Sequence, residues 1–319
     1  MVRMKRCMIA ALMVVGLAAN EAAWAQAQTF PNHRMTILVS STAGGSLDTM
    51  ARLLAEFLKK KYDQAVIVDD RPGAADIPAM TPLLAAPADG HSLAFAGNQH
   101  IGLLFIKDMP YDVNSFTPVS ILNQTPYALV ASKGSGFRNI KDMVAWAKAN
   151  PGKLTMGAVT GVHTLNQYQA AAALGFEPNV ILYKGFAPLE TAVLSNEVNV
   201  SVFGNIGKVK TGQITGLVTA GDQRNADIPD VPTYKELGIT FDQRASYTVW
   251  TRSAVPADIL DKLTKDCQEL VRTPEYSTRV TNGLGIPAIG STREFAVKYF
   301  VQEYQDLKAT ADRIGLKPQ

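Results

Sequence analysis

The sequence predicts an α/β fold of two lobes, each a mostly parallel sheet flanked by helices, with a ligand cleft between the lobes. First, short apolar strand patterns alternate with helical patterns along most of the chain, which favours parallel sheets covered on both faces. Second, a chain of 319 residues exceeds the comfortable size of one core. Third, glycine-containing and polar junctions follow several strand patterns, where open α/β sheets bind ligands.

The first 25 residues have the pattern of a cleaved secretory signal peptide. Arg3, Lys5 and Arg6 form a positive segment, 8–19 is almost purely apolar, and Ala23-Trp24-Ala25 has the small-x-small pattern of a cleavage site. The apolar segment is too short to cross the roughly 30 Å hydrocarbon core of a bilayer as a helix. We therefore expect cleavage near Ala25 and export, with an uncleaved anchor as the alternative.

Charge and cysteine content exclude several classes of protein. The formal net charge is +3, and cleavage would remove three basic residues and one acidic residue, leaving +1. A nearly neutral chain lacks the positive surface that phosphodiester contacts require, so we expect no nucleic-acid partner. Cys7 lies in the leader, and Cys267 would remain without a disulfide partner. The helical spacing of apolar residues around Cys267 predicts that Cys267 is a buried residue rather than a nucleophile.

The predicted elements of the first third are three strands and a helix. Residues 35–40, 65–68 and 92–96 have strand patterns. Between the first two strands, apolar residues recur with a period of 3.6 from Ser46 to Leu58. Ser46 is the expected N-cap of this helix, because serine oxygens accept from first-turn amides.

The middle of the chain repeats this alternation, and the last third is mostly helical. Strand patterns occupy 127–131, 154–159, 180–183, 198–203 and 216–220. Helical patterns occupy 140–149, about 164–174, a segment opened by Pro188, 256–271 and 292–314.

Three strand-to-helix junctions are candidate anion sites. They are Thr42-Ala43-Gly44-Gly45-Ser46, Thr160-Gly161 and Lys184-Gly185. A helix start presents unpaired amides and the positive end of the helix dipole, and glycine allows close backbone approach. A tight turn without a ligand is the alternative for each. Neither a P-loop nor a dinucleotide fingerprint is present.

Several side chains near these junctions have two possible roles. Asp48 in the first helical turn contacts the ligand or caps the helix, and Lys184 pairs with an anion or is solvated. His100 and His163 follow strands and donate to a ligand or lie at the surface. For Tyr247 and Trp250 we expect core packing.

Motifs for catalysis and metal binding are missing from the sequence. It contains no G-x-S-x-G, H-E-x-x-H or C-x-x-C. The paired carboxylates Asp69 and Asp70 precede Arg71, so solvation or an arginine pair is their expected fate. We expect neither an enzyme nor a bound cofactor or metal.

With these junctions identified, the chain resembles the substrate-binding proteins of tripartite tricarboxylate transporters, also called the Bordetella uptake gene family. The resemblance covers about residues 30–319, and its order and spacing make it specific. The similar segments include Phe30-Pro31, Ala43-Gly44-Gly45, Ala51-Arg52-Leu53-Leu54-Ala55-Glu56, Arg71-Pro72-Gly73-Ala74, Ala88-Asp89-Gly90, Phe116-Thr117-Pro118-Val119, Tyr183-Lys184-Gly185 and Pro229-Asp230-Val231-Pro232-Thr233.

The resemblance implies a periplasmic binding protein of the type II fold, which delivers a small organic carboxylate to a two-component membrane carrier, and we expect it to be a monomer. After the signal peptide at 1–25, we expect a first lobe formed by 26–126 and 246–319 and a second lobe at 127–245. Tyr127 and Arg244 then lie near the hinge, although packing is the alternative role for both. The candidate ligand-binding residues are Thr42, Ala43, Gly44, Gly45, Ser46, Asp48, Asn98, Thr160, Thr164, Lys184, Gly185 and Asn205.

This sequence departs from the family pattern at pocket positions. Ser40-Ser41 replace a proline and an aromatic residue, and Asn199 and Gly204 stand where acidic residues are common. These changes leave open a different carboxylate or a neutral ligand. The alternatives in function are a sensing module that signals to a membrane receptor and a periplasmic enzyme that uses the same cleft.

Overall fold

The computed structural model describes residues 30–73, 76–103, 105, 109, 111–159, 161–203 and 206–316. The expected signal peptide and its cleavage site lie outside the described residues, as do Thr160, Gly204 and Asn205. In the described part, no helix is sufficiently long and apolar to cross a membrane.

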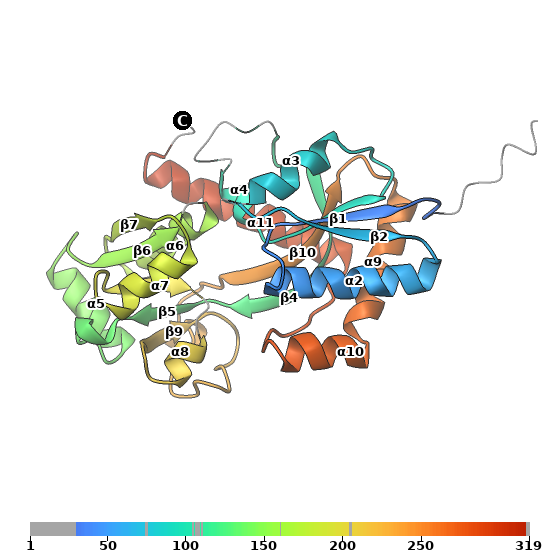
Figure 1. Ribbon diagram of the computed structural model, residues 1–319. Helices are drawn as coiled ribbons and strands as arrows, with labels where there is room; N and C mark the ends of the chain where they lie inside the picture. Colours follow the sequence, from blue (N-terminus) through green and yellow to red (C-terminus); the bar gives the residue numbers. More distant parts are fainter. Residues whose placement is uncertain are drawn as a thin grey trace, which may run out of the picture.

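Two lobes, each built on a five-stranded sheet, lie side by side (Figure 1). The first sheet has the order β2-β1-β3-β10-β4. Its strands are β1 (Met35–Val39), β2 (Val66–Asp70), β3 (Ser92–Ala96), β4 (Phe116–Pro126) and β10 (Arg244–Arg252). β1 pairs in parallel with β2 and β3, whereas β10 is antiparallel to both β3 and β4. Four of the five strands therefore share one direction.

The second sheet repeats this arrangement in the order β7-β6-β8-β5-β9. Its strands are β5 (Ala128–Ala131), β6 (Thr155–Val159), β7 (Asn179–Tyr183), β8 (Val200–Phe203) and β9 (Thr215–Thr219). β6 is parallel to β7 and β8, and β5 is antiparallel to β8 and β9. The prediction of two mostly parallel sheets is confirmed.

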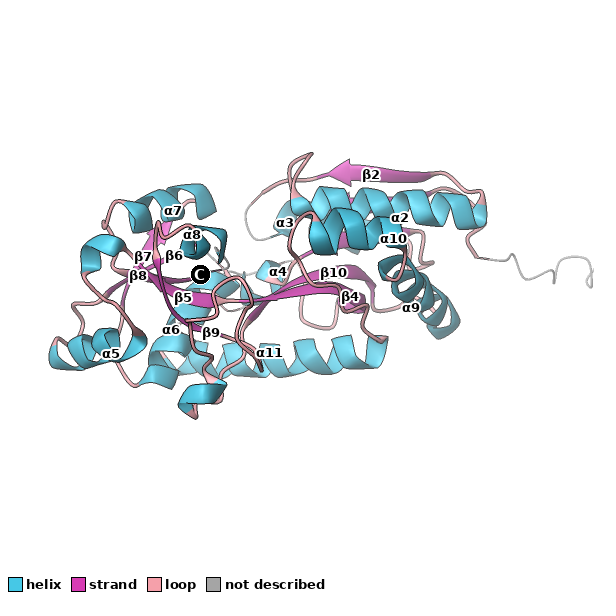
Figure 2. Cartoon of the chain, turned by 90° about the horizontal axis from the view of Figure 1, so that it is seen from below, coloured by secondary structure: helices cyan, strands magenta, loops and turns pink. Residues whose placement is uncertain are grey.

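Helices cover the faces of both sheets (Figure 2). Those of the first lobe are α2 (Ser46–Tyr62), α3 (Ile77–Ala85), α4 (Gln99–Leu103), α9 (Ala257–Val271), α10 (Pro274–Tyr276) and α11 (Arg293–Arg313). Those of the second lobe are α5 (Ile140–Ala149), α6 (Val162–Leu174), α7 (Phe186–Leu194) and α8 (Ile206–Lys210). Short 3₁₀ turns occupy Lys133–Ser135 and Lys235–Leu237, and a π-helical turn occupies Ser277–Asn282. Because α11 packs against both β4 and α6, this helix bridges the lobes.

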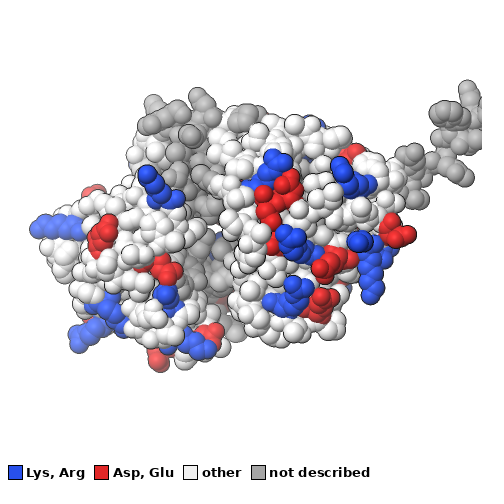
Figure 3. Space-filling model, viewed as in Figure 1, with Lys and Arg blue, Asp and Glu red and all other residues white. Residues whose placement is uncertain are grey.

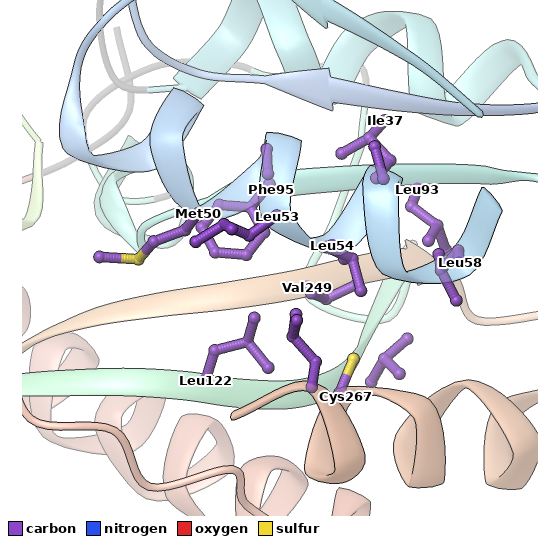
Figure 4. Packing of buried hydrophobic residues seen from close by; sticks show 14 of the residues in the cluster. Ile37, Met50, Leu53, Leu54, Leu58, Leu93, Phe95, Leu122, Val249 and Cys267 are labelled. Carbon is purple, nitrogen blue, oxygen red and sulfur yellow. The ribbon is translucent and has the colours of Figure 1, made fainter. Parts of the chain in front are cut away.

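The core of the first lobe explains the position of α2. Its apolar residues, including Met50, Leu54 and Leu58, lie between the sheet and α9 (Figure 4). Cys267 points into the same core from α9 and is 2% exposed. Burial also raises the pKa of its thiol, so the prediction of a buried, unreactive cysteine is confirmed.

Two predicted helix starts are wrong by one or two residues. Gly45 rather than Ser46 occupies the N-cap of α2, and no side chain bonds there as a conventional cap. The carboxylate of Asp48 instead accepts from the Gly44 N–H, at 2.7 Å. In the second lobe, α6 begins at Val162 rather than near Thr164.

The sequence did not predict β4, because this strand carries polar residues in a buried position. The amide of Asn123 donates to the Ile286 carbonyl at 3.0 Å, and that of Gln124 donates to Ser246 Oγ at 3.0 Å. Tertiary partners therefore satisfy groups that in sequence indicate a loop. Helix α3 was also not predicted, and it contains Pro82.

Two crossovers join the lobes. β4 passes through Tyr127 into β5, and the chain returns through Gln243 into β10. The two crossovers are bonded to each other, because the Tyr127 N–H donates to the Gln243 carbonyl at 3.0 Å. The Tyr127 carbonyl also accepts from Ala220 N–H at 2.8 Å. The predicted lobe limits and the hinge at Tyr127 and Arg244 stay predictions.

Replacing Leu54 by alanine should lower the free energy of unfolding by about 2–5 kcal/mol, because Leu54 is 1% exposed and alanine leaves a cavity. The matched control is Leu194→Ala on α7, since Leu194 is 42% exposed, and its effect should stay within about 0.5 kcal/mol. Urea unfolding measures both. Equal losses in the two variants would contradict the assignment of the core.

Candidate functional site

A cleft of about 730 Å³ lies between the lobes, and Figure 3 shows the hollow from one side. This volume falls within the roughly 300–1,000 Å³ of small-molecule sites. Both lobes contribute to its lining: Ser40, Leu47, Gly73, Asp76, Gly97, Asn98, Gln99, Tyr127, Val159, Tyr183, Lys184, Gly185, Phe186, Glu190, Phe203, Ala245, Ser246 and Tyr247.

The cleft lies at the carboxyl ends of the parallel strands of both sheets. β1 and β3 lead to Ser40 and Asn98 on one wall, and β7 leads to Lys184 and Gly185 on the other. Three predicted site residues, Asn98, Lys184 and Gly185, therefore line one cavity although they come from different lobes. This is the position at which open α/β sheets place ligands.

The Thr42–Ser46 junction lies beside the cleft, and its internal bonds differ from the expectation. Thr42, Ala43 and Gly44 are exposed and do not belong to the lining, whereas the flanking Ser40 and Leu47 do. The Gly45 N–H donates to the Thr42 carbonyl at 3.1 Å. Since the Gly44 N–H donates to Asp48, both glycine amides are satisfied within the loop rather than directed at a ligand.

Asp48 stabilises this loop. The residue is 3% exposed, and its Oδ1 lies 2.7 Å from Arg52 Nε. Burial alone would raise the pKa of this carboxyl, but the bonds from Arg52 and from the Gly44 N–H outweigh burial and lower the pKa. The contacts give Asp48 a structural role, because it closes the loop before α2 without capping a helix amide.

The acidic pair on β2 is engaged in the expected way. Arg71 lies 2.8 Å from Asp69, and Arg52 lies 3.0 Å from Asp70. The prediction that these carboxylates are solvated or paired with arginine is confirmed.

Two buried polar atoms on the first-lobe wall lack hydrogen-bond partners among the described residues. They are Ser40 Oγ and Gln99 Oε1. Buried polar groups in folded proteins are nearly always satisfied, so unsatisfied ones in a cleft are candidate ligand contacts. Sequence reasoning missed Gln99 and noted Ser40 only as a departure from the family pattern.

The cleft lining contains one cation, Lys184, and two carboxylates, Asp76 and Glu190, both of which have partners. Glu190 is paired with Lys208 at 3.0 Å. Asp76 accepts from the Gln99 N–H at 3.0 Å and lies 3.4 Å from His100 Nδ1. Lys184 is exposed and forms no ion pair with the described part of the chain. At about 4 Å, a unit charge pair is worth about 1 kcal/mol in water and about 4 kcal/mol at an effective dielectric constant of 20.

His163 holds strand ends together and does not line the cleft. Its Nδ1 accepts from the Val159 N–H at 3.0 Å, so Nε2 carries the proton that it donates to the Val202 carbonyl at 2.6 Å. Burial lowers the pKa of this imidazole to about 4. Thr164 is similarly occupied, because its hydroxyl donates to the Val159 carbonyl at 2.8 Å.

Three other residues are placed differently from the simplest sequence expectation. Tyr247, expected in the core, lines the cleft, whereas Trp250 is 3% exposed as expected. His100 is buried rather than on the surface. Asn199, regarded as a pocket position, lies at the amino end of β8 and accepts from Thr155, away from the cleft.

One group of possible metal ligands occurs among the described residues, at His33, Asp89 and His91. The Asn32 N–H donates to His91 Nε2 at 3.2 Å, so a neutral ring carries its proton on Nδ1, 3.2 Å from Asp89 Oδ1. A metal ion needs a lone pair at that nitrogen. The observed bonds therefore favour a local polar network over a metal site.

Comparison with known proteins identifies the family. Residues 50–315 match the tripartite tricarboxylate transporter family receptor. The chain belongs to this family. It is 31% identical to a UPF0065 protein of Bordetella bronchiseptica over 302 residues, which cover 90% of this chain and 88% of the relative. It is also 31% identical to a UPF0065 protein of Cupriavidus necator, with 96% and 95% covered.

Solved structures agree on the fold. A protein described as a periplasmic transporter has a TM-score of 0.74 at 22% identity and covers 91% of this chain and 99% of its own. The R. palustris protein Rpa4515, solved with adipate, has a TM-score of 0.74 at 22% identity, with 91% and 100% covered. MatC from Rhodopseudomonas palustris, solved with malate, has a TM-score of 0.72 at 22% identity, with 88% and 100% covered. This chain is therefore a non-enzymatic receptor of the tripartite tricarboxylate transporter family, and it has the type II fold of periplasmic solute-binding proteins.

The buried imidazole of His163 should make stability pH-dependent. Its folded pKa of about 4 lies below the ordinary value of about 6.5. The unfolded chain therefore binds the proton first, and the contribution is fully present above about pH 6.5 and is lost as the pH falls towards 4. We expect a loss of about 2 kcal/mol between pH 7 and pH 5.

Urea unfolding at these two pH values, compared between wild type and His163→Gln, measures this contribution. In His163→Gln, the change in unfolding free energy between pH 7 and pH 5 should be smaller by about 2 kcal/mol. In His33→Gln, whose imidazole is partly exposed, the contribution of His163 to that change should remain. An unchanged pH dependence in His163→Gln would show that His163 is not buried in its neutral form.

Proposed function

We propose that this receptor captures a small organic carboxylate in the interlobe cleft and delivers it to a two-component membrane carrier for uptake. The observation that carries the proposal is Lys184, a cation on the cleft wall that forms no ion pair with the described residues, whereas the carboxylates of the same lining have partners of their own. Relatives of the same fold have been solved with adipate and malate, both carboxylates, which supports this ligand class.

The second-lobe wall offers backbone donors beside Lys184. Gly185 is the N-cap of α7, and no side chain bonds to the first-turn amides. The amides of Phe186 and Ala187 lack partners four residues earlier in the helix, and Pro188 has no N–H. A carboxylate beside Lys184 would therefore also meet the positive end of a helix dipole.

The first-lobe wall supplies further polar groups, Ser40 Oγ and the side chain of Asn98. Hydrogen bonds to charged groups contribute about 1.5–3 kcal/mol each, and micromolar binding needs about 8 kcal/mol. Contacts from one wall do not reach this sum easily, because association also costs translational and rotational freedom. Tight capture thus requires both walls.

Closure of the lobes follows from this requirement. We propose that the crossovers at Tyr127 and Arg244 act as the hinge between lobe 1 (26–126 and 246–319) and lobe 2 (127–245). A ligand that contacts both walls binds the closed state better and shifts the population towards it. We also propose that the chain is cleaved near Ala25 and then acts as a monomer. The intact mass of the exported protein tests the cleavage site, and native mass spectrometry tests the monomer.

A sensing role would need the same closure, so binding alone does not separate it from transport. Radiolabelled uptake and a transcriptional reporter in a deletion strain separate the two. Loss of uptake with an intact transcriptional response supports transport, and the reverse result supports sensing.

A thermal-shift screen of mono-, di- and aromatic carboxylates, with neutral amides of the same shape, tests the ligand class. A ligand at 100 times its dissociation constant adds about 2.7 kcal/mol of stability. We expect stabilisation by a carboxylate and not by its amide. Stabilisation by neutral solutes alone would refute the proposed class.

Lys184→Ala should weaken binding of the best carboxylate by about 10- to 150-fold, since it removes a charge-assisted contact of about 1.5–3 kcal/mol. Lys184→Arg should retain much of the affinity. Lys141→Ala is the matched control, because Lys141 is exposed on α5 and lies outside the cleft lining. Isothermal titration calorimetry gives the three dissociation constants, and a wild-type value for Lys184→Ala would contradict the role of Lys184.

A further inference from the structure

The side chain of Asn98 connects the cleft to Glu303 on α11, a partly exposed residue whose carboxyl oxygen Oε2 is enclosed. Asn98 lines the cleft and is 2% exposed. Its Nδ2 donates to Glu303 Oε1, although 205 residues separate the two positions. The other end of the amide, Oδ1, has no hydrogen bond with the described residues and is not enclosed, so it is the end left for the cleft.

Glu303 has few other partners. Its second oxygen, Oε2, is buried and forms no hydrogen bond with the described residues, and the carboxyl forms no ion pair with them. A carboxylate with one buried, unsatisfied oxygen is unfavourable, because nothing replaces its lost hydration. A protonated carboxyl in the same place has an O–H to donate, and the amide of Asn98 is the polar group in contact with it.

The two ends of an amide have opposite polarity, so the proton on Glu303 determines which end of Asn98 the carboxyl can bind. A carboxylate has no donor, so it accepts from Nδ2 and leaves Oδ1 for the cleft. A carboxylic acid can still accept from Nδ2, but it can also donate to Oδ1, which turns Nδ2 to the cleft. The protonated form alone therefore permits the arrangement in which both N–H groups of Nδ2 are available to an anion.

We propose that Glu303 is a positioning residue that sets the charge preference of the cleft: its proton allows the Asn98 N–H₂ to turn towards an anionic ligand, and loss of the proton holds the Asn98 carbonyl there. The inference rests on the proposed function only in taking the ligand to be an anion. Anion binding and protonation of Glu303 then favour each other, because linkage is reciprocal.

The surroundings of Glu303 support a protonated group near neutral pH. Burial raises its pKa to about 8, the bond from Asn98 opposes this rise, and Asp306 adds to it. Glu303 also lines a second cavity of about 680 Å³ on α6, α11 and the crossover at 240–243. This cavity gives its proton a route that does not pass through the cleft.

The other titratable groups on the elements around Glu303 are compatible with this assignment. Burial raises the pKa values of Tyr127 and Tyr299, which ordinarily lie well above neutral pH, and lowers the pKa of His163 to about 4. The Arg313 guanidinium, which lines the second cavity, donates to the Tyr168 carbonyl at 3.3 Å. Other charged or titratable groups near Glu303 in the described part of the chain include Asp76, His100, Tyr168, Asp242, Tyr247, Tyr304 and Asp306.

The test first uses the protein without ligand. In ¹⁵N NMR spectra, the side-chain N–H₂ signals of Asn98 should titrate with a midpoint near pH 8. Glu303→Gln should abolish this titration, because a glutamine side chain does not ionise. Asp306→Asn is the control: it removes a neighbouring charge, so the midpoint should fall by less than one unit and the titration should persist. Circular dichroism establishes that both variants are folded.

The pH titration of the Asn98 signals decides between support and rejection of the proposal. Asn98 signals that do not change between pH 6 and pH 10, or that still titrate in Glu303→Gln, would overturn the proposal. A titration near pH 8 that disappears in Glu303→Gln supports it.

Binding provides the second readout, with adipate and malate as probes. The competent fraction of Glu303 falls about tenfold between pH 7 and pH 9, so wild-type affinity should fall by about the same factor. Glu303→Gln, whose amide can donate to Asn98 Oδ1 at every pH, should show no such fall. A tenfold fall that persists in Glu303→Gln would overturn the proposal. If neither probe binds at any pH while the Asn98 titration is present, the amide switch stands and the carboxylate function is weakened.

Discussion

The pairing of β10 with β4 is the constraint on which the rest of the structure depends. β4 leaves the first sheet for the second lobe, and β10 returns antiparallel to it and enters between β3 and β4. This arrangement joins two sheets of the same design at one junction, where Tyr127 is bonded to Gln243. The parallel strands of both sheets therefore end at a shared cleft, and residues that follow those strands become its walls.

The two lobes differ in whether the backbone N–H groups at their glycine-containing helix starts are hydrogen-bonded. In the first lobe, Asp48 and the Thr42 carbonyl take up the amides of Gly44 and Gly45, so the loop is held in shape by its own residues. In the second lobe, α7 begins at Gly185 without a side-chain cap. The same kind of sequence, glycine before a helix, thus has a structural role in one lobe and leaves donors available in the other.

Two polar side chains, His163 and Glu303, differ in how fully they are hydrogen-bonded. His163 has both ring nitrogens satisfied and acts as a neutral strut between β6 and β8. Glu303 is partly exposed as a residue, but its carboxyl has one partner and one enclosed, unsatisfied oxygen among the described residues. A fully satisfied group holds one arrangement, whereas a partly satisfied one has bonding capacity left. His163 therefore supports the scaffold, and Glu303 is the group for which we propose a response to the ligand.

The sequence by itself determined the alternation of strands and helices, the burial of Cys267 and the position of Asn98, Lys184 and Gly185 after strands, because these features depend on local periodicity and strand direction. It did not reveal β4, whose polar residues are paired with segments far along the chain. Only the tertiary structure decided that Asp48 closes its own loop and that Glu303 meets Asn98. The reason is that a buried hydrogen bond needs a partner with the right geometry, and when 205 residues lie between donor and acceptor no local pattern encodes it.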